Sequence, residues 1–359
     1  MRRPAALGRP VVVKVGSSSL SAPGVGLAPD AIARVAAQVE SLWESGRPTV
    51  LVSSGAVAAG LPVLGLTSPP ADLPGSQVAA AVGQSRLMES YGGAFGARGR
   101  VTGQVLLTRD VLARRDQYLH SREALERMLG LGVVPIVNEN DTVVVDELKL
   151  GDNDRLAAIV AHLVDASMLI ILTDTAGLYS SDPRLQPQAE MISAVLHTDE
   201  VLDELWRTSS KGVLGSGGVA TKIAAARMAA WSGIPTVIAP ADEVEATLRA
   251  ATGEEVGTWV EPHPAKLPSR KLWIAFGLPA AGKLTVDDGA RHALVANGGS
   301  LLAVGVASVE GEFGVGDAVE ILDSAGALIG KGLTRMVSTE VTAGLSGPLV
   351  HRDDMVVLV

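Results

Sequence analysis

The chain has 359 residues, more than the roughly 250–300 at which a single hydrophobic core usually stops growing, so its length predicts two domains. Hydrophobic residues make up 47% of the sequence and charged residues 19%, which excludes a chain that is mainly disordered. The net charge of −9 argues against a protein that binds nucleic acid over its whole surface, and the absence of cysteine excludes disulfides and thiolate chemistry.

The N-terminal apolar stretch does not have the pattern of a secretory signal, because Lys14 interrupts it and no small-residue cleavage site follows. No apolar run reaches the roughly 18 residues of a membrane-spanning helix. We therefore expect a cytoplasmic protein with no membrane partner.

Short β-branched runs alternate with amphipathic stretches along the first two-thirds of the chain. This alternation predicts an α/β fold, with a mainly parallel central sheet sandwiched by helices. The clearest predicted strands cover residues 11–15, 49–52, 133–137, 168–172 and 236–239. The clearest predicted helices cover residues 29–45, 76–91, 121–131, 154–163 and 221–232.

A proline-rich stretch interrupts this pattern after residue 261 and predicts a linker, because prolines at this density fit neither a helix nor a central strand. We place the first domain at residues 1–262, the linker at 263–270 and the second domain at 271–359. Short glycine-rich strands such as 318–322 and 355–359, with one clear helix near 289–297, predict a small β-rich, barrel-like second domain.

Two predicted strands of the first domain end in small polar residues and glycine. Lys14 is followed by Gly16 and three serines, which could bind an anion through backbone N–H groups or simply form a solvated strand exit. Residues 53–57 repeat the pattern, and their serines could cap the next helix, contact a ligand at the same sheet edge, or both.

Hydrogen-bonding side chains are densest in residues 138–141, Asn-Glu-Asn-Asp, and in residues 151–154, Gly-Asp-Asn-Asp. The second group also fits a helix N-cap with acidic residues in the first turn. The first group fits no such local role. A buried strand that ends in four polar side chains favours a ligand carrying an ammonium or amide group.

A glycine-rich loop at residues 215–218 precedes Thr221 and Lys222 at the start of a predicted helix. Together with the polar exit of the strand that ends at Leu172, this loop favours a site for nucleotide phosphates. A surface hairpin is the alternative for the glycines, although it does not account for the lysine at the helix start.

The order of these motifs resembles that of the amino-acid kinase family. The segments that carry the resemblance are 13–18 (VKVGSS), 53–56 (SSGA), 83–85 (GQS), 104–108 (QVLLT), 137–141 (VNEND), 151–154 (GDND), 172–174 (LTD) and 182–184 (DPR). Residues 284–290, 299–302 and 311–313 resemble the PUA domain that bacterial members append. The resemblance implies ATP-dependent phosphorylation of the side-chain carboxylate of L-glutamate to L-glutamyl 5-phosphate, the first step of proline biosynthesis.

The resemblance also implies roles for individual residues. The implied catalytic residues are Lys14, Lys222 and Asp154, with Asp154 organising both lysines. The implied glutamate-binding residues are Ser54, Asn138, Asp141 and Asn153. The implied ATP-binding residues are Lys14, Thr173, Asp174, Ser216, Gly217, Gly218, Val219, Ala220, Thr221 and Lys222, with Ser216 and Val219 replacing the Thr and Met that are usual in the family.

The expected ligands and partners follow from the same resemblance and from charge. Mg²⁺ is expected as a cofactor held mainly by the ATP phosphates, with no dedicated protein metal site. Proline is expected as a feedback inhibitor, because it shares the α-carboxylate and cationic nitrogen of glutamate. A homo-oligomer, either a dimer or a tetramer, is also expected.

Two alternatives stay open from the sequence. Another member of the family would phosphorylate aspartate, acetylglutamate, carbamate or a nucleoside monophosphate, although the paired polar motifs and the appended domain favour glutamate. An RNA-binding protein with an inert kinase-like part is the second alternative. From residue 271 onward there are six Lys or Arg and ten Asp or Glu, a net charge of −4, so no nucleic-acid partner is expected.

Overall fold

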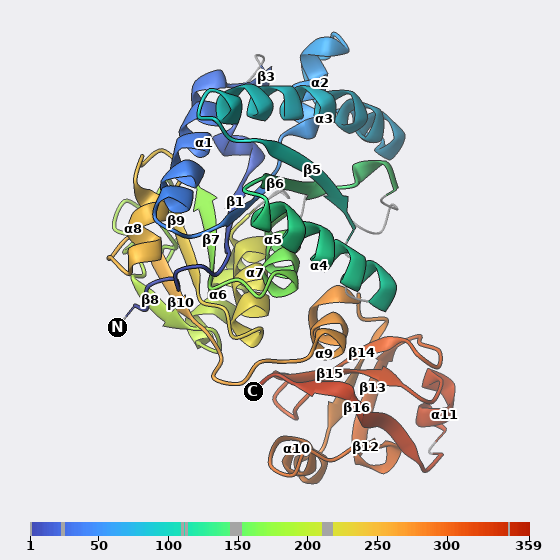
Figure 1. Ribbon diagram of the computed structural model, residues 1–359. Helices are drawn as coiled ribbons and strands as arrows, with labels where there is room; N and C mark the ends of the chain where they lie inside the picture. Colours follow the sequence, from blue (N-terminus) through green and yellow to red (C-terminus); the bar gives the residue numbers. More distant parts are fainter. Residues whose placement is uncertain are drawn as a thin grey trace. The chain divides into compact units, whose positions relative to one another are not determined.

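The chain folds into two compact units, Met1–Lys266 and Leu267–Val359 (Figure 1). The computed structural model describes residues 2–22, 26–108, 111, 114–143, 153–209, 218–343 and 345–359. The division between the units falls inside the predicted linker, while the bounds of that linker stay a prediction. No helix in these described ranges is long and apolar enough to cross a membrane.

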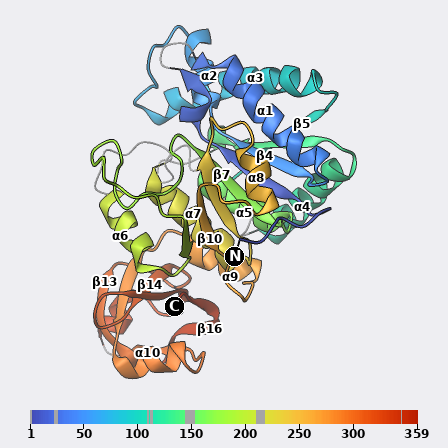
Figure 2. The ribbon, with the colours of Figure 1, turned by 90° about the vertical axis from the view of Figure 1, so that its left-hand side faces the viewer.

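An eight-stranded sheet forms the centre of the first unit (Figures 1 and 2). Its strands, in spatial order, are β5 (Thr102–Leu107), β6 (Val134–Glu139), β4 (Thr49–Ser53), β1 (Val11–Val15), β7 (Met168–Thr173), β9 (Thr236–Pro240), β10 (Thr258–Glu261) and β8 (Ala194–Leu196). The strands pair in parallel apart from the antiparallel β9 and β10, as far as the described residues go. The predicted mainly parallel sheet is confirmed.

Helices cover both faces of this sheet, as the buried, nearly continuous apolar strands require (Figure 2). The helices of the first unit are α1 (Pro29–Glu44), α2 (Ala56–Val63), α3 (Leu73–Gly96), α4 (Arg115–Gly130), α5 (Asn153–Leu163), α6 (Glu200–Ser209), α7 (Val219–Trp231) and α8 (Ala246–Thr252). Val11, Val13 and Val15 pack with residues of α1, α3 and α8 in one core. Since side chains alternate along a strand, Lys14 belongs to the opposite face, where α5 contacts β1.

The largest differences from the predicted helix bounds are in α3, which ends at Gly96 rather than at residue 91, and in α4, which begins at Arg115 rather than at residue 121. The sequence predicted a helix only from residue 76, but α3 begins at Leu73, with Pro74 in its first turn and Asp72 accepting a hydrogen bond from the Gly75 N–H at 2.7 Å. The sequence did not predict α6, α8 or α2, the last of which contains Gly60 and Pro62. Tertiary packing against α3 overrides these weak local preferences.

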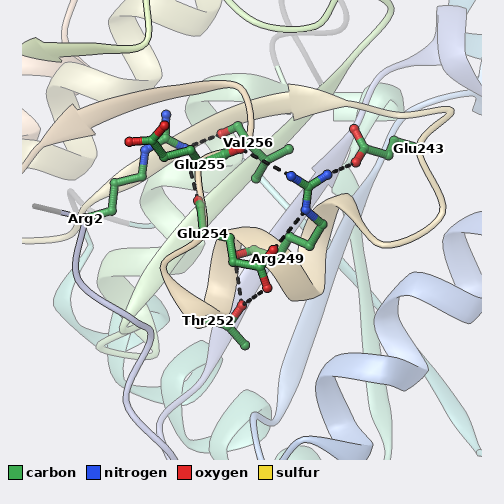
Figure 3. A network of polar contacts seen from close by, with 7 residues as sticks. All are labelled: Arg2, Glu243, Arg249, Thr252, Glu254, Glu255 and Val256. Atoms are coloured by element: carbon green, nitrogen blue, oxygen red, sulfur yellow. Dashed lines mark hydrogen bonds and ion pairs between the residues drawn. The ribbon is translucent and has the colours of Figure 1, made fainter.

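A polar network holds the N-terminal segment of the first unit (Figure 3). The Arg2 guanidinium donates to the backbone carbonyls of Val256 and of Gly257, the latter at 2.8 Å. Arg249, on α8, pairs with Glu243 in the segment before the helix and with Glu254 in the loop after it. The network ties the chain's start to the segment that leads into β10.

The second unit is built on a six-stranded, mostly antiparallel sheet. Its strands, in spatial order, are β12 (Leu301–Leu302), β16 (Pro348–Val357), β15 (Leu328–Thr334), β14 (Ala318–Leu322), β11 (Gly282–Val286) and β13 (Val306–Gly311). Its α-helices are α9 (Ser269–Leu272), α10 (Asp288–Val295) and α11 (Ser338–Thr342). The predicted β-rich domain is confirmed, and α10 corresponds to its one predicted helix.

Candidate active site

A cavity of about 600 Å³ opens at the carboxyl ends of β1, β4, β6 and β7. These four strands are neighbours in the sheet and parallel, so their ends meet at one edge, which is where ligands bind in open α/β sheets. Seven of the predicted site residues line it: Lys14, Ser54, Asn138, Asp141, Asn153, Thr173 and Lys222.

The ammonium of Lys14 and the carboxylate of Asp154 form a buried ion pair, with 2.6 Å between Nζ and Oδ1. The other carboxylate oxygen accepts a hydrogen bond of 2.6 Å from the Thr221 hydroxyl. Burial alone would raise the pKa of Asp154, but attraction to Lys14 and Lys222 and the two hydrogen bonds outweigh it and lower this pKa. Asp154 is therefore a carboxylate held between two cations.

The first turn of α7 brings Lys222 and Thr221 to this carboxylate. The Thr221 hydroxyl also hydrogen-bonds the Gly218 carbonyl oxygen at 2.9 Å. Lys14, Asp154 and Lys222, which lie far apart in the sequence, thus meet at one point of the cavity.

Amide side chains form a second polar cluster beside this ion pair. Nδ2 of Asn138 donates to Oε1 of Gln84 at 2.8 Å, and Oδ1 of Asn138 accepts from Nδ2 of Asn153 at 2.8 Å. Nδ2 of Asn153 also donates to the Ser54 hydroxyl oxygen at 2.9 Å. The predicted residues Ser54, Asn138 and Asn153 are therefore in contact. Gln84 was not among the predicted site residues, although it lies in the GQS motif.

Asp141 lines the same cavity at the start of a 3-10 turn, Asp141–Val143. Burial raises the pKa of Asp141 to about 7, and the neighbouring Glu139 carboxylate contributes to the increase. Unlike Asp154, this carboxyl group is paired with no lysine in the described part of the chain. It is therefore poised to gain stability from a cationic ligand.

The remaining predicted nucleotide residues fall into two groups. Thr173 ends β7 at the cavity, and Asp174 lines an adjoining hollow of about 400 Å³ together with Asp242 and Glu243. Gly218, Val219 and Ala220 begin α7. Ser216 and Gly217 lie outside the described residues, as do Gly151 and Asp152 of the second polar motif.

The left-handed backbone of Gly55, with φ of +108°, joins β4 to α2 and so fixes the position of Ser54. Behind this turn, α2 crosses α3 so closely that a methyl group at Gly83 would overlap the carbonyl oxygen of Ala56. One wall of the cavity is thus set by backbone packing.

The mainly parallel sheet, with two lysines gathered around one carboxylate at its carboxyl edge, defines an α/β protein with its candidate site where such sheets bind ligands. Residues 9–240 match the model of the Amino acid kinase family, and residues 282–350 match that of the PUA domain. The chain belongs to the amino acid kinase family.

Relatives match over nearly the full length. The chain is 44% identical to a "Glutamate 5-kinase" of Marinomonas sp. (strain MWYL1), with 100% of both chains covered. It is 47% identical to a "Glutamate 5-kinase" of Frankia casuarinae, covering 98% of this chain and 97% of that one. The crystal structure of UMP kinase from Bacillus anthracis shares the fold, with a TM-score of 0.50 and 15% identity over 74% of this chain and 99% of that one.

Proposed function

We propose that this protein uses ATP to phosphorylate the side-chain carboxylate of L-glutamate, which yields L-glutamyl 5-phosphate for proline biosynthesis. The observation that carries the proposal is the carboxylate of Asp154 held between Lys14 and Lys222, beside a cavity with separate acidic and amide groups. The match to relatives named "Glutamate 5-kinase" along nearly the whole chain supports it.

The reaction needs positive charge rather than a general base, because the carboxylate nucleophile is already ionised near pH 7. Two anions must approach in line, so catalysis rests on cations and positioning. Lys14 would stabilise the transferring phosphoryl group, and Lys222 the leaving phosphates. Asp154 would keep both lysines charged and oriented.

The glutamate backbone would be held at the other side of the cavity. Asp141 would pair with the α-ammonium, since it is the one carboxylate among the four proposed glutamate-binding residues. Ser54, Asn138 and Asn153 would hydrogen-bond the remaining polar atoms of the substrate. Proline offers the same α-carboxylate and a cationic nitrogen, so it would compete for this site as an inhibitor.

The nucleotide would lie along the start of α7, with Thr173, Asp174 and residues 216–222 around it. Mg²⁺ would enter with ATP and reduce the charge of its phosphates. No group of three His, Asp or Glu that could hold a metal lies in the described ranges, so no protein cage for the ion is proposed. The carboxylate of Asp154, moreover, already forms an ion pair with Lys14.

Trapping the acyl phosphate with hydroxylamine tests the proposal. We expect glutamyl hydroxamate in equal amount to ADP, and only when ATP, Mg²⁺ and glutamate are all present. Aspartate, acetylglutamate, carbamate and UMP serve as alternative acceptors. ATP consumption that is independent of glutamate, or faster with one of these acceptors, would contradict the assignment.

The expected homo-oligomer is a separate part of the proposal. Light scattering of the same preparation would test it, and a monomeric mass would contradict it.

A further inference from the structure

Gln84 lies on α3, behind the cavity rather than in its lining, and only 9% of the residue is exposed. Its side chain reaches the end of β6, where Oε1 accepts the hydrogen bond from Nδ2 of Asn138. Its own Nε2 has no hydrogen-bond partner in the described part of the chain. Within the described part of the chain, the hydrogen bond to Asn138 is therefore the one that the Gln84 side chain makes.

The side-chain amide of Asn138 has a defined orientation, with its oxygen as acceptor and its nitrogen as donor. Oδ1 of Asn138 accepts from the backbone N–H of Glu139 at 2.9 Å and from Nδ2 of Asn153. A backbone N–H can only donate, so this oxygen must face Glu139, and Nδ2 of Asn138 must face Gln84. Oε1 of Gln84 gives this Nδ2 its acceptor and so adds to the orientation that the Glu139 N–H imposes, in which Asn138 takes a hydrogen from Asn153.

The hydrogen bonds of Asn153 connect Asn138 to Ser54 in the cavity lining. Nδ2 of Asn153 shares its two hydrogens among three acceptors: Oδ1 of Asn138 at 2.8 Å, the Ser54 hydroxyl oxygen at 2.9 Å and the more distant Ser53 carbonyl oxygen at 3.2 Å. Because the Ser54 oxygen accepts from Asn153, its own hydrogen is left to donate to another group. Ser54 lines the cavity, so this hydrogen is available to an anionic ligand.

We propose that Gln84 is a positioning residue that holds Asn138 in place and so stabilises the hydrogen-bond polarity of the glutamate site. By orienting Asn138, and through it Asn153, it keeps the Ser54 hydroxyl as a donor to the α-carboxylate of the substrate. Without the Gln84 acceptor, Nδ2 of Asn138 loses its partner, and the hold of Asn138 on Asn153, and of Asn153 on Ser54, is loosened. This inference rests on the proposed function, since it assumes that glutamate binds at Ser54.

Two substitutions at Gln84 separate the acceptor from the shape of the side chain. Gln84→Met keeps the approximate length but removes the acceptor, and it should raise the KM for glutamate by about tenfold while leaving the KM for ATP nearly unchanged. Gln84→Glu keeps an acceptor oxygen, so its KM for glutamate should stay close to that of the wild type. Tyr91→Phe is the matched control, because it removes a buried hydrogen bond from the same helix to Ser53 and leaves the amide chain intact.

The α-amide of glutamate, isoglutamine, provides a readout that a merely structural role would not move. It keeps the reactive side-chain carboxylate but replaces the α-carboxylate. Wild type, Gln84→Glu and Tyr91→Phe should discriminate strongly against isoglutamine, and Gln84→Met should lose most of that discrimination.

The outcomes separate the positioning role from the proposed function. Equal effects on the KM of glutamate and of ATP, or unchanged discrimination in Gln84→Met, would overturn the positioning role alone. If Gln84→Met does not fold, a folded Gln84→Glu with a strongly raised KM for glutamate would overturn it equally. A wild-type protein that makes no glutamyl hydroxamate would overturn the proposed function and this inference with it.

Discussion

Lys14 and Asp154 face each other across the junction of β1 and α5, with side chains only 3% and 1% exposed. Removing either partner leaves an uncompensated charge in a buried place, which costs about 3–5 kcal/mol in typical proteins. The pair therefore couples the stability of this sheet edge to the proposed chemistry.

Asp154→Asn should lower kcat by about a hundredfold or more, because Lys14 and Lys222 lose the carboxylate that orients them. Asp165→Asn is the matched control, since Asp165 pairs with Arg9 and Lys266 while half exposed, and exposed pairs contribute little. Steady-state kinetics and thermal unfolding of both variants make the comparison. A normal kcat for Asp154→Asn would remove this residue from the mechanism.

Lys14→Ala and Lys222→Ala should each lower kcat far more than they raise the KM for glutamate. The reason is that both cations act on charge that develops during phosphoryl transfer rather than on bound glutamate. Initial-rate measurements at saturating ATP test this expectation, and near-normal kcat in either variant speaks against it.

The carboxyl group of Asp141 should make glutamate binding depend on pH. Its pKa is raised to about 7, so the charged form that pairs with an ammonium is lost as the pH falls through that value. The KM for glutamate should therefore fall between about pH 6 and 8, and Asp141→Asn should have a high KM that varies little across that range. The KM for ATP is the internal control.

The raised pKa of Asp141 should also make the stability of the folded chain depend on pH. The folded chain binds this proton more tightly than the unfolded chain, so the stabilising contribution is fully present below the ordinary pKa of 3.8 and is lost as the pH rises through about 7. Denaturant titrations of wild type and Asp141→Asn at several pH values should show that the wild type loses this contribution to its free energy of unfolding as the pH rises.

Proline inhibition of Asp141→Asn tests whether proline and glutamate share this residue. Inhibition that survives intact in Asp141→Asn, alongside lost glutamate affinity, would show that the two ligands do not share it.

The crossing of α2 and α3 should tolerate no side chain at Gly83. Gly83→Ala places a methyl group against the Ala56 carbonyl and should destabilise the fold by about 3 kcal/mol. Gly93→Ala lies on the same helix, where an added Cβ meets nothing within 4 Å, and should stabilise it by roughly 1 kcal/mol. Urea unfolding of the two variants decides, and equal midpoints would contradict the close crossing.

Residues 1–266 should fold and phosphorylate glutamate without the second unit. The proposed catalytic residues all precede the division at Lys266, and the core that packs α1, α3 and α8 on the sheet lies within the first unit. A truncated chain that is folded by circular dichroism but lacks all activity would assign the second unit a role in catalysis.

The sequence predicted the central strands well, because a short run of apolar residues such as Met168 to Leu172 in β7 is typical of a strand buried on both faces. It also predicted the residues that meet at the cavity, because the resemblance linked Lys14, Asp154 and Lys222 across more than two hundred positions. Local preference could not predict α2, since Gly60 and Pro62 weaken a helix that tertiary packing restores.

Two properties of the site depend on contacts that a sequence does not display. The raised pKa of Asp141 results from its burial and from the nearby Glu139 carboxylate. The part played by Gln84 depends on which atom of Asn138 faces it, which only the geometry defines. The GQS motif was the one signal that pointed to Gln84.

The most direct test of the proposed phosphorylation is to follow the oxygen atoms of the glutamate side chain. Glutamate labelled with ¹⁸O in its side-chain carboxylate is incubated with the protein, ATP, Mg²⁺ and hydroxylamine, and the released phosphate is analysed by mass spectrometry. If the carboxylate attacks the terminal phosphorus of ATP, the bridging oxygen is its own, and attack of hydroxylamine on the acyl carbon releases phosphate that carries the label. We predict labelled phosphate in equal amount to the glutamyl hydroxamate, whereas unlabelled phosphate would contradict attack by the side-chain carboxylate.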